Sequence, residues 1–254
     1  MASVAITVYD EERADLFVSH QRTIDTLLTL PHNDESRAEM LEEFRRISPD
    51  DDTTRTEIEL FNRKYHSNNA IRWYTRSSPL TRTIGRALRS SDVDMMFKFR
   101  YYLKDLYTHL DGIYRQTHYF RQFSGVEKFY RGQALSKKCL HSFQQLIGHI
   151  ISINTFFSTT NSLQVALFFA NSFPNNDDCL RVIFCIENEN FIPNPRPYAN
   201  ISWLSRYPDE EEVLFAMGSI FRIRLIEDLD QTNPLPVIYL QMIDPATFNW
   251  NHPL

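Results

Sequence analysis

The chain has 254 residues and a formal net charge of −5, with 43% hydrophobic and 13% aromatic residues. This apolar share supports a folded core and excludes wholesale disorder, and the length suits one large domain or two small ones. The acidic balance argues against a dedicated nucleic-acid binder, and no apolar run reaches the roughly 18 residues of a membrane span. We therefore expect neither a nucleic acid nor a membrane as a partner.

The cysteines point to a reducing compartment. Cys139, Cys179 and Cys185 show no C-x-x-C spacing, and their odd number favours free thiols over a disulfide framework. The short apolar opening from Val4 to Val8 has no basic lead, so it is a poor signal peptide. These features predict a cytoplasmic protein.

The first part of the chain predicts a short strand followed by polar helices. Val4–Tyr9 is strand-like, and Glu35–Ile47 and Thr53–Lys64 have the pattern of helices, separated by a break at Ser48–Asp52. Ser67–Pro79 is predicted to be a loop and a boundary. We therefore divide the chain into a mostly helical lead-in (residues 1–66) and a second domain (residues 67–254).

The strongest helical pattern lies in the first part of that second domain. Apolar side chains recur there at steps of three and four residues: Met95, Phe99, Tyr102, Leu103, Leu106, Leu110 and Ile113. An aromatic stripe of this kind is far more often a core face than a cofactor site. Residues 67–122 are thus predicted to be helical.

After Gly125 the sequence becomes rich in β-branched and aromatic residues, so residues 123–254 are predicted to be β-rich. Strands are expected at Lys128–Gly132, Ile151–Phe157, Leu180–Ile186, Val213–Phe215, Ile220–Ile226 and Val237–Met242. Helices are expected at Ser136–Gln145 and Leu163–Ala170, the second opened by a capping box of Asn161 and Gln164. Helices first and strands later indicate an α+β fold.

Three short motifs carry residues suited to chemistry. The first is Phe129-Tyr130-Arg131-Gly132-Gln133, in which the Arg131 guanidinium matches phosphate oxygens and Gly132 allows a flat ligand to approach the backbone. The second is Ser158-Thr159-Thr160 at the end of an aromatic strand, although hydroxyls also suit turns and caps there. The third is Glu210-Glu211-Glu212, directly before an apolar strand.

An arginine on a strand, a serine at a strand end and a Glu-x-Glu pair, in that order, resemble the signature of the cholera-toxin-like mono-ADP-ribosyltransferases, in the version of animal arginine-specific enzymes. The resemblance covers about Arg72 to Asp244. It implies a core of two small packed β-sheets flanked by helices, with NAD as co-substrate and no metal. It also implies a partner protein with an accessible arginine as acceptor.

The resemblance assigns a role to each matched residue. Arg131 would contact NAD and brace the site, and the backbone of Gly132 would hydrogen-bond the nicotinamide amide. Ser158 would support the catalytic glutamate and the NAD site. Glu212 would be the catalytic glutamate, and Glu210 would orient and deprotonate the attacking arginine. The family's triplet is Ser-Thr-Ser, so Thr160 is a departure that keeps a hydroxyl.

The same resemblance points to two further parts of the site. The segment Trp203–Pro208 has the character of the substrate-recognition loop, and its Ser205 would be another NAD contact. Phe169 or Phe173 would lie against nicotinamide, with no basis for choosing between them. If the acidic segment is extended, Glu211 should face away from its two neighbours.

Other chemistries have little support. The eight histidines form no H-E-x-x-H motif, and neither G-x-G-x-x-G nor a P-loop motif is present. Arginine-directed mono-ADP-ribosyl transfer is therefore the leading hypothesis. An NAD glycohydrolase shares every site residue, and a non-catalytic binding module of the same fold is the alternative from another class.

Overall fold

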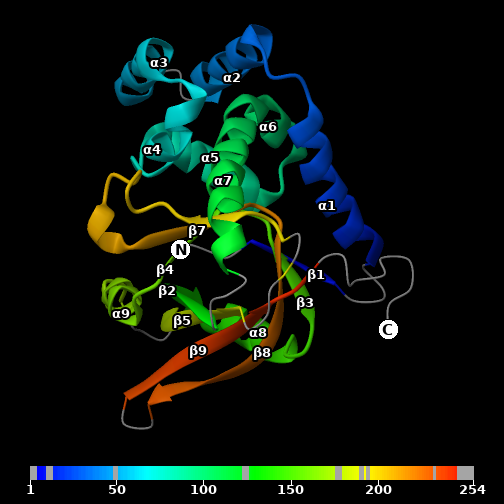
Figure 1. Cartoon of the computed structure of the whole chain (residues 1–254), viewed down its shortest axis with the longest axis vertical. Coiled ribbons are helices and arrows are strands. Elements are labelled where there is room, and N and C mark those ends of the chain that lie inside the picture. The colour runs from blue at the N-terminus through cyan, green and yellow to red at the C-terminus, as the bar shows by residue number, and fades with distance from the viewer. Residues whose placement is uncertain are drawn as a thin grey trace.

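The computed structural model describes residues 5–9, 14–47, 51–121, 126–174, 179–188, 192, 195–230 and 233–244. Its helices are α1 (Ala14–Thr29), α2 (Asp34–Ile47), α3 (Asp52–Lys64), α4 (Ala70–Tyr74), α5 (Pro79–Ser90), α6 (Val93–Lys98), α7 (Arg100–Arg121), α8 (Lys137–Gln145) and α9 (Leu163–Asn171), with 3-10 turns η1 (Ser67–Asn69) and η2 (Pro208–Glu210). The strands are β1 (Ile6–Tyr9), β2 (Glu127–Ser136), β3 (Ile150–Ile153), β4 (Phe157–Thr160), β5 (Cys179–Asn188), β6 (Tyr198–Asn200), β7 (Glu212–Phe215), β8 (Ser219–Asp230) and β9 (Asn233–Met242). Helices α2 to α7 lie together on one side of the strands (Figure 1). Within the described ranges, no helix combines the length and apolar character needed to cross a membrane.

The described strands form one continuous nine-stranded sheet that is divided at one point into two parts, called here the larger and the smaller sheet. They are hydrogen-bonded in the order β1-β3-β8-β9-β5-β2-β4-β7-β6, but β2 and β4 share a single register pair, Tyr130 with Thr160. Across this junction the rings of Phe129 and Phe215 lie 5.3 Å apart, and those of Phe157 and Phe184 lie 5.8 Å apart, both edge to face. The larger sheet (β1 to β2) and the smaller sheet (β4, β7 and β6) therefore pack on each other through an aromatic core. The predicted α+β fold with two small packed sheets is confirmed.

The apolar stripe of the helical part is a core face, as predicted. Tyr102, Leu106 and Leu110 of α7 are fully buried in the main helical core cluster. The stripe does not lie on one helix, however. Helix α6 ends at Lys98 and α7 begins at Arg100, with buried Phe99 between them in a non-helical conformation.

Most predicted elements are present with shifted ends, and local hydrogen bonds explain where several begin. The Ser78 side chain accepts from the Thr81 N–H, with Pro79 in the first turn of α5, which is a favourable helix start. Asp51 caps α3 in the same way, while the predicted break at residues 48–50 lies outside the described residues. The predicted capping box at Asn161 is wrong, because Ser162 is the N-cap of α9.

One predicted strand is divided in two. Residues 151–157 were expected to be continuous, but β3 ends at Ile153 and β4 begins at Phe157. Asn154 donates its backbone N–H to the Ala5 carbonyl at 2.9 Å and its Nδ2–H to Thr7 Oγ1 at 2.9 Å. These bonds hold the residue after β3 against β1, and the chain then crosses from the larger sheet to the smaller one.

The predicted loop at 67–79 contains η1 and α4, and α4 contributes to the same core as the lead-in. The ring of Phe61 in α3 lies 5.2 Å from that of Trp73 in α4 and 6.3 Å from that of Tyr102 in α7. The domain division at residue 67 stays a prediction, but the hydrophobic core is continuous across it.

Helix α1 is bonded to both sheets. The Gln21 Nε2 donates to Ser152 Oγ at 2.8 Å and to the Gly218 carbonyl at 3.2 Å, and the Gln21 Oε1 accepts from Arg196 at 2.8 Å. Gly218 has φ +80°, and a Cβ there would come within 2.7 Å of Ile24 Cδ1. The positive φ thus favours glycine in the turn that follows β7, and the close approach of α1 leaves little room for a side chain there.

Candidate active site

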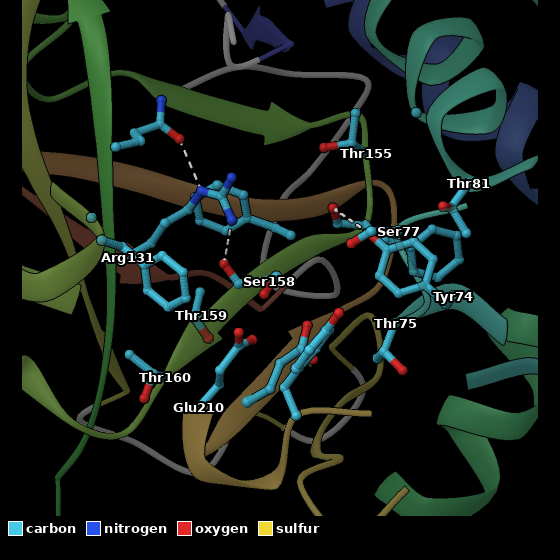
Figure 2. A pocket seen from close by; sticks show the side chains of 18 of the residues that line it. Tyr74, Thr75, Ser77, Thr81, Arg131, Thr155, Ser158, Thr159, Thr160 and Glu210 are labelled. Carbon is cyan, nitrogen blue, oxygen red and sulfur yellow. Dashed lines mark hydrogen bonds between the residues drawn. The ribbon is translucent and has the colours of Figure 1, made fainter. Parts of the chain in front are cut away.

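A cavity of about 600 Å³ lies where the two sheets meet, beneath helices α4 and α5. Its wall contains five of the residues that the sequence singled out: Arg131, Gly132, Ser158, Glu210 and Glu212. Figure 2 shows Arg131, Ser158 and Glu210 around the same space, with Tyr74 and Thr81 on the opposite side. A cavity of this size suits a small-molecule or cofactor site.

Arg131 is held in a fixed orientation. Its Nε–H donates to the Gln133 Oε1 at 2.9 Å and its Nη1–H donates to the backbone carbonyl of Ser158 at 2.7 Å (Figure 2). The guanidinium carbon lies 5.0 Å from the centre of the Phe157 ring, a cation–π contact. Burial lowers the pKa of Arg131, and the neighbouring Tyr74 and Glu212 act in the opposite direction. The side chain nevertheless keeps its charge, since an arginine is not deprotonated in proteins.

Gly132 lines the cavity, but helix α9 supplies the structural reason for glycine at this position. A Cβ on Gly132 would lie 1.8 Å from the Ala166 carbonyl oxygen and 2.6 Å from the Ala170 N. Both are backbone atoms of α9, which cannot move away as a flexible side chain could. Glycine therefore allows α9 to pack directly on β2. Its proposed contact with nicotinamide remains a prediction.

The hydroxyls of the Ser-Thr-Thr triplet have three different surroundings. Thr159 Oγ1 donates to the Val213 carbonyl at 2.7 Å and so ties β4 to β7. Thr160 Oγ1 accepts from the Ser162 N–H at 3.1 Å, next to the start of α9. Ser158 lies in the cavity wall and hydrogen-bonds the carboxylate of Glu212. Thr160 is the residue that differs from the family's Ser-Thr-Ser triplet, and its hydroxyl thus has a local hydrogen-bond partner.

Glu212 is a buried carboxylate at the start of β7. Its side chain is 6% exposed, and it pairs with Thr160 across the smaller sheet. Burial raises the pKa of Glu212, hydrogen bonds from Ser158 and Ser205 lower it, and the nearby Glu210 raises it further. A carboxylate in such a site interacts strongly with any positive charge that enters the cavity.

Glu210 reaches the cavity by a route that the sequence did not predict. The segment is not extended, because Glu210 ends the 3-10 turn η2 and Glu211 has a left-handed backbone with φ 47°. This turn leaves Glu211 exposed and outside the cavity wall, while Glu210 and Glu212 both line it. Burial raises the pKa of the half-buried Glu210.

Ser205 is not among the residues that line the cavity, and its contact with NAD stays a prediction. It is buried behind Glu212, where its Oγ donates to the Glu212 Oε2 at 3.4 Å and accepts from the Tyr207 N–H at 3.1 Å. The structure thus makes Ser205 a support for the carboxylate and for the loop before it.

One face of α5 also lines the cavity, and the sequence analysis missed it. Arg82, Gly85 and Arg89 recur at steps of three and four residues, so they lie on one side of the helix. The Arg82 Nη1 donates to the Ser77 carbonyl at 2.9 Å, and both arginines are exposed. The spacing of Arg82 and Arg89 could have predicted, from the sequence, a basic helix face in the same site as Glu210 and Glu212.

Tyr74 of α4 was missed as well, and nothing in its local sequence marks it. Its hydroxyl donates to the Phe156 carbonyl at 3.4 Å in the cavity wall. Burial raises the pKa of Tyr74, and the charge of Glu212 contributes in the same direction. Tyr74 is therefore a neutral hydroxyl beside the buried carboxylate.

Aromatic rings complete the wall. Both candidates for a ring contact, Phe169 and Phe173, line the cavity, and Tyr207 does so from the loop before β7. The described part of the chain contains no group of three or more histidine, cysteine or acidic side chains arranged to hold a metal ion. The site thus combines a basic helix face, aromatic surfaces, one fixed arginine and two carboxylates of raised pKa.

Comparison with known proteins supports the fold. No family model matches the chain, and no curated protein matches it in sequence. The Vis toxin of Vibrio splendidus, an ADP-ribosyltransferase, matches with a TM-score of 0.51 and 21% identity over 88% of this chain and 93% of that one. The ADP-ribosyltransferase HopU1 of Pseudomonas syringae pv. Tomato DC3000 matches with a TM-score of 0.51 and 19% identity over 93% of this chain and 99% of that one. The described chain therefore has an ADP-ribosyltransferase-like fold.

Proposed function

We propose that this protein is a mono-ADP-ribosyltransferase that transfers ADP-ribose from NAD to an arginine side chain of a partner protein and releases nicotinamide. The observation that carries the proposal is the convergence of Arg131, Ser158, Glu210 and Glu212 on one cavity of about 600 Å³. These residues come from three separate sequence motifs and from both sheets. NAD would be a co-substrate consumed in the reaction.

The charges of the cavity match the parts of NAD. Arg82 and Arg89 present guanidinium groups from α5, which suit the oxygens of a pyrophosphate. Phe169 and Phe173 offer ring faces on which a nicotinamide or adenine ring can stack. The nicotinamide ring of NAD is cationic, so its arrival beside Glu212 would offset the cost of the buried carboxylate.

Glu212 would stabilise the transition state of the first bond cleavage. When the bond between the ribose C1′ and the nicotinamide nitrogen breaks, nicotinamide leaves with the electron pair and positive charge develops on the ribose. A buried carboxylate already held in place by Ser158 and Ser205 needs little reorganisation to stabilise that charge. Stabilisation of this kind acts on the transition state more than on bound NAD.

Glu210 would act on the acceptor. A guanidinium nitrogen of the partner's arginine attacks the ribose C1′, forms the new C–N bond and gives up one proton. Glu210 lies in the cavity wall, and burial raises the pKa of its carboxyl group, which makes it a better proton acceptor than an exposed glutamate. Glu210 would also orient the guanidinium by accepting its hydrogen bonds.

The test is incubation with NAD labelled in the adenylate part, together with agmatine and a panel of arginine-containing proteins. Wild type should label arginine donors and release nicotinamide. Glu210→Gln should keep nicotinamide release but lose most of the labelling, while Glu211→Gln, outside the cavity, serves as the matched control. Nicotinamide release that is unaffected by saturating agmatine, with no labelled guanidine, would instead identify an NAD glycohydrolase. Absence of NAD binding would indicate a non-catalytic module.

A further inference from the structure

Two polar side chains interrupt an apolar row on β2. Alternate residues of a strand face the same side, and Phe129 and Leu135 belong to the core between the sheets. Arg131 and Gln133 occupy the two positions between them on that face. Both side chains line the cavity, yet Gln133 is only 3% exposed and lies in a row where an apolar side chain would satisfy packing.

The amide of Gln133 is used at only one end. Its Oε1 accepts from the Nε–H of Arg131 at 2.9 Å, whereas its buried Nε2 has no hydrogen-bond partner among the described residues. An unpaired buried N–H typically costs about 1–3 kcal/mol, which leucine or methionine would avoid. Among the described residues the amide therefore acts through its oxygen, which accepts from Arg131.

The bond from Gln133 fixes an otherwise free rotation. Bonded at Nη1 alone, a guanidinium can pivot about that one contact. With Nε held by Gln133 and Nη1 held by the Ser158 carbonyl, the plane of the Arg131 guanidinium is defined at two points. Neither bond uses Nη2, which leaves that nitrogen for a ligand in the cavity that Arg131 lines.

We propose that Gln133 is a positioning residue for NAD binding: its amide oxygen orients the Arg131 guanidinium so that the remaining N–H groups meet the dinucleotide. The inference rests on the proposed use of NAD, and it concerns ground-state binding. Gln133 also lines the cavity, but its side-chain hydrogen bond is to Arg131, so it acts on NAD through that residue. Loss of the Gln133 amide should therefore weaken NAD affinity and raise KM while leaving kcat within about twofold. This pattern is expected when the lost interaction stabilises bound NAD and the transition state equally.

The test is a double-mutant cycle on the NAD dissociation constant measured by calorimetry. In Gln133→Leu the new side chain has a similar volume and suits the apolar row on β2. The substitution removes both the acceptor oxygen and the unpaired N–H. We expect about a 10-fold weaker affinity, the size of one hydrogen bond to a charged group, with a thermal midpoint close to that of wild type. Arg131→Met should weaken NAD binding more, and adding Gln133→Leu to Arg131→Met should change the affinity no further.

Two more variants make the result specific. Gln133→Glu keeps an acceptor oxygen and should bind NAD more tightly than Gln133→Leu. If Gln133→Leu folds poorly, Gln133→Met takes its place, because methionine also removes the acceptor oxygen and the unpaired N–H. Leu135→Met, a core change on the same row outside the cavity, should leave NAD affinity unchanged. Wild-type affinity in Gln133→Leu, or an equal effect of Gln133→Leu with and without Arg131, would overturn the positioning role. Wild type that does not bind NAD would overturn the proposed function as well, which is a distinct result.

Discussion

The Nη1 of Arg131 donates a 2.7 Å hydrogen bond to the backbone carbonyl of Ser158, and this bond joins the two sheets beside their single register pair. The same guanidinium lines the cavity, so one side chain serves both the junction and the site. A residue with two such tasks should not tolerate a conservative exchange.

Arg131→Lys should therefore lower both stability and NAD affinity. A lysine ammonium is a point charge and cannot bond Gln133 and the Ser158 carbonyl in the fixed fork geometry of a guanidinium. We expect a loss of about 1.5–3 kcal/mol in unfolding free energy, the range for a hydrogen bond to a charged group. Urea unfolding and NAD titration measure the two effects. Wild-type values for both would contradict the dual role of Arg131.

Glu212→Gln should separate binding from chemistry. The amide keeps the shape of the side chain but loses the negative charge that would stabilise the developing ribose cation. Removal of one such preorganised group typically lowers kcat by about 10²–10³-fold. Nicotinamide release in a single-turnover assay should fall accordingly, while the NAD dissociation constant should stay within about threefold. A loss confined to NAD affinity would argue for a binding role instead.

The same substitution should change how stability depends on pH. Burial raises the pKa of Glu212 above its ordinary 4.5, so its charged form is disfavoured in the folded protein. Below that ordinary value both folded and unfolded chains hold the proton, and the carboxyl group favours neither state. As the pH rises, the Glu212 carboxyl ionises first in the unfolded chain, where its pKa is lower. The wild-type protein therefore loses stability until the pH passes the pKa of Glu212 in the folded protein. Glu212→Gln should therefore have a higher thermal midpoint than wild type near pH 7, with a smaller difference near pH 4. A difference that grows towards acid would show that the pKa is lowered.

Two glycine-to-alanine changes should have opposite effects. In Gly132→Ala the new methyl group would overlap the backbone of α9, so we expect a loss of at least about 1–3 kcal/mol. In Gly112→Ala of α7 nothing lies within 4 Å of the new Cβ, and alanine is a better helix former by about 1 kcal/mol. Thermal unfolding of both variants gives the comparison. Equal midpoints would mean that α9 can move away from β2.

The basic face of α5 should contribute a salt-dependent part of NAD affinity. Arg82→Gln and Arg89→Gln should each weaken NAD binding by about three- to tenfold at low salt, with a smaller effect at about 1 M salt, where exposed charges are screened. Arg86→Gln is the matched control, because Arg86 is exposed on the same helix but does not line the cavity. A similar loss in all three variants would indicate a general effect of net charge.

Much of the fold follows from local patterns in the sequence. The strand that carries Arg131 and the strand that follows Glu212 were predicted because β-branched and aromatic residues mark strands regardless of their neighbours. The apolar stripe of α7 was predicted for a similar reason. The division between β3 and β4 was not predicted, because Asn154, at the crossing between them, is held by partners at Ala5 and Thr7, more than a hundred residues away.

The site was predicted only in part, and the physical reason is similar. The wall of the cavity that the strands form was predicted from three motifs, because their residue types suit NAD chemistry. The other wall of the cavity comes from α4 and α5. Tyr74 reaches this wall only because α4 packs on Phe156. The position of Ser205 behind Glu212 depends on a left-handed residue, Glu211, that the run of glutamates did not reveal.

The bonds of Gln21 have a consequence for how this protein could be divided. Through one side chain, α1 is attached to β3, to the turn that follows the Glu212 strand and to Arg196 ahead of β6. A fragment starting at residue 67 would leave the polar partners of Gln21 uncovered and would remove Ile24 from the core. Residues 67–254 are therefore not a structurally independent unit: a gene fusion or recombination that replaced the first 66 residues would have to bring an equivalent helix with it.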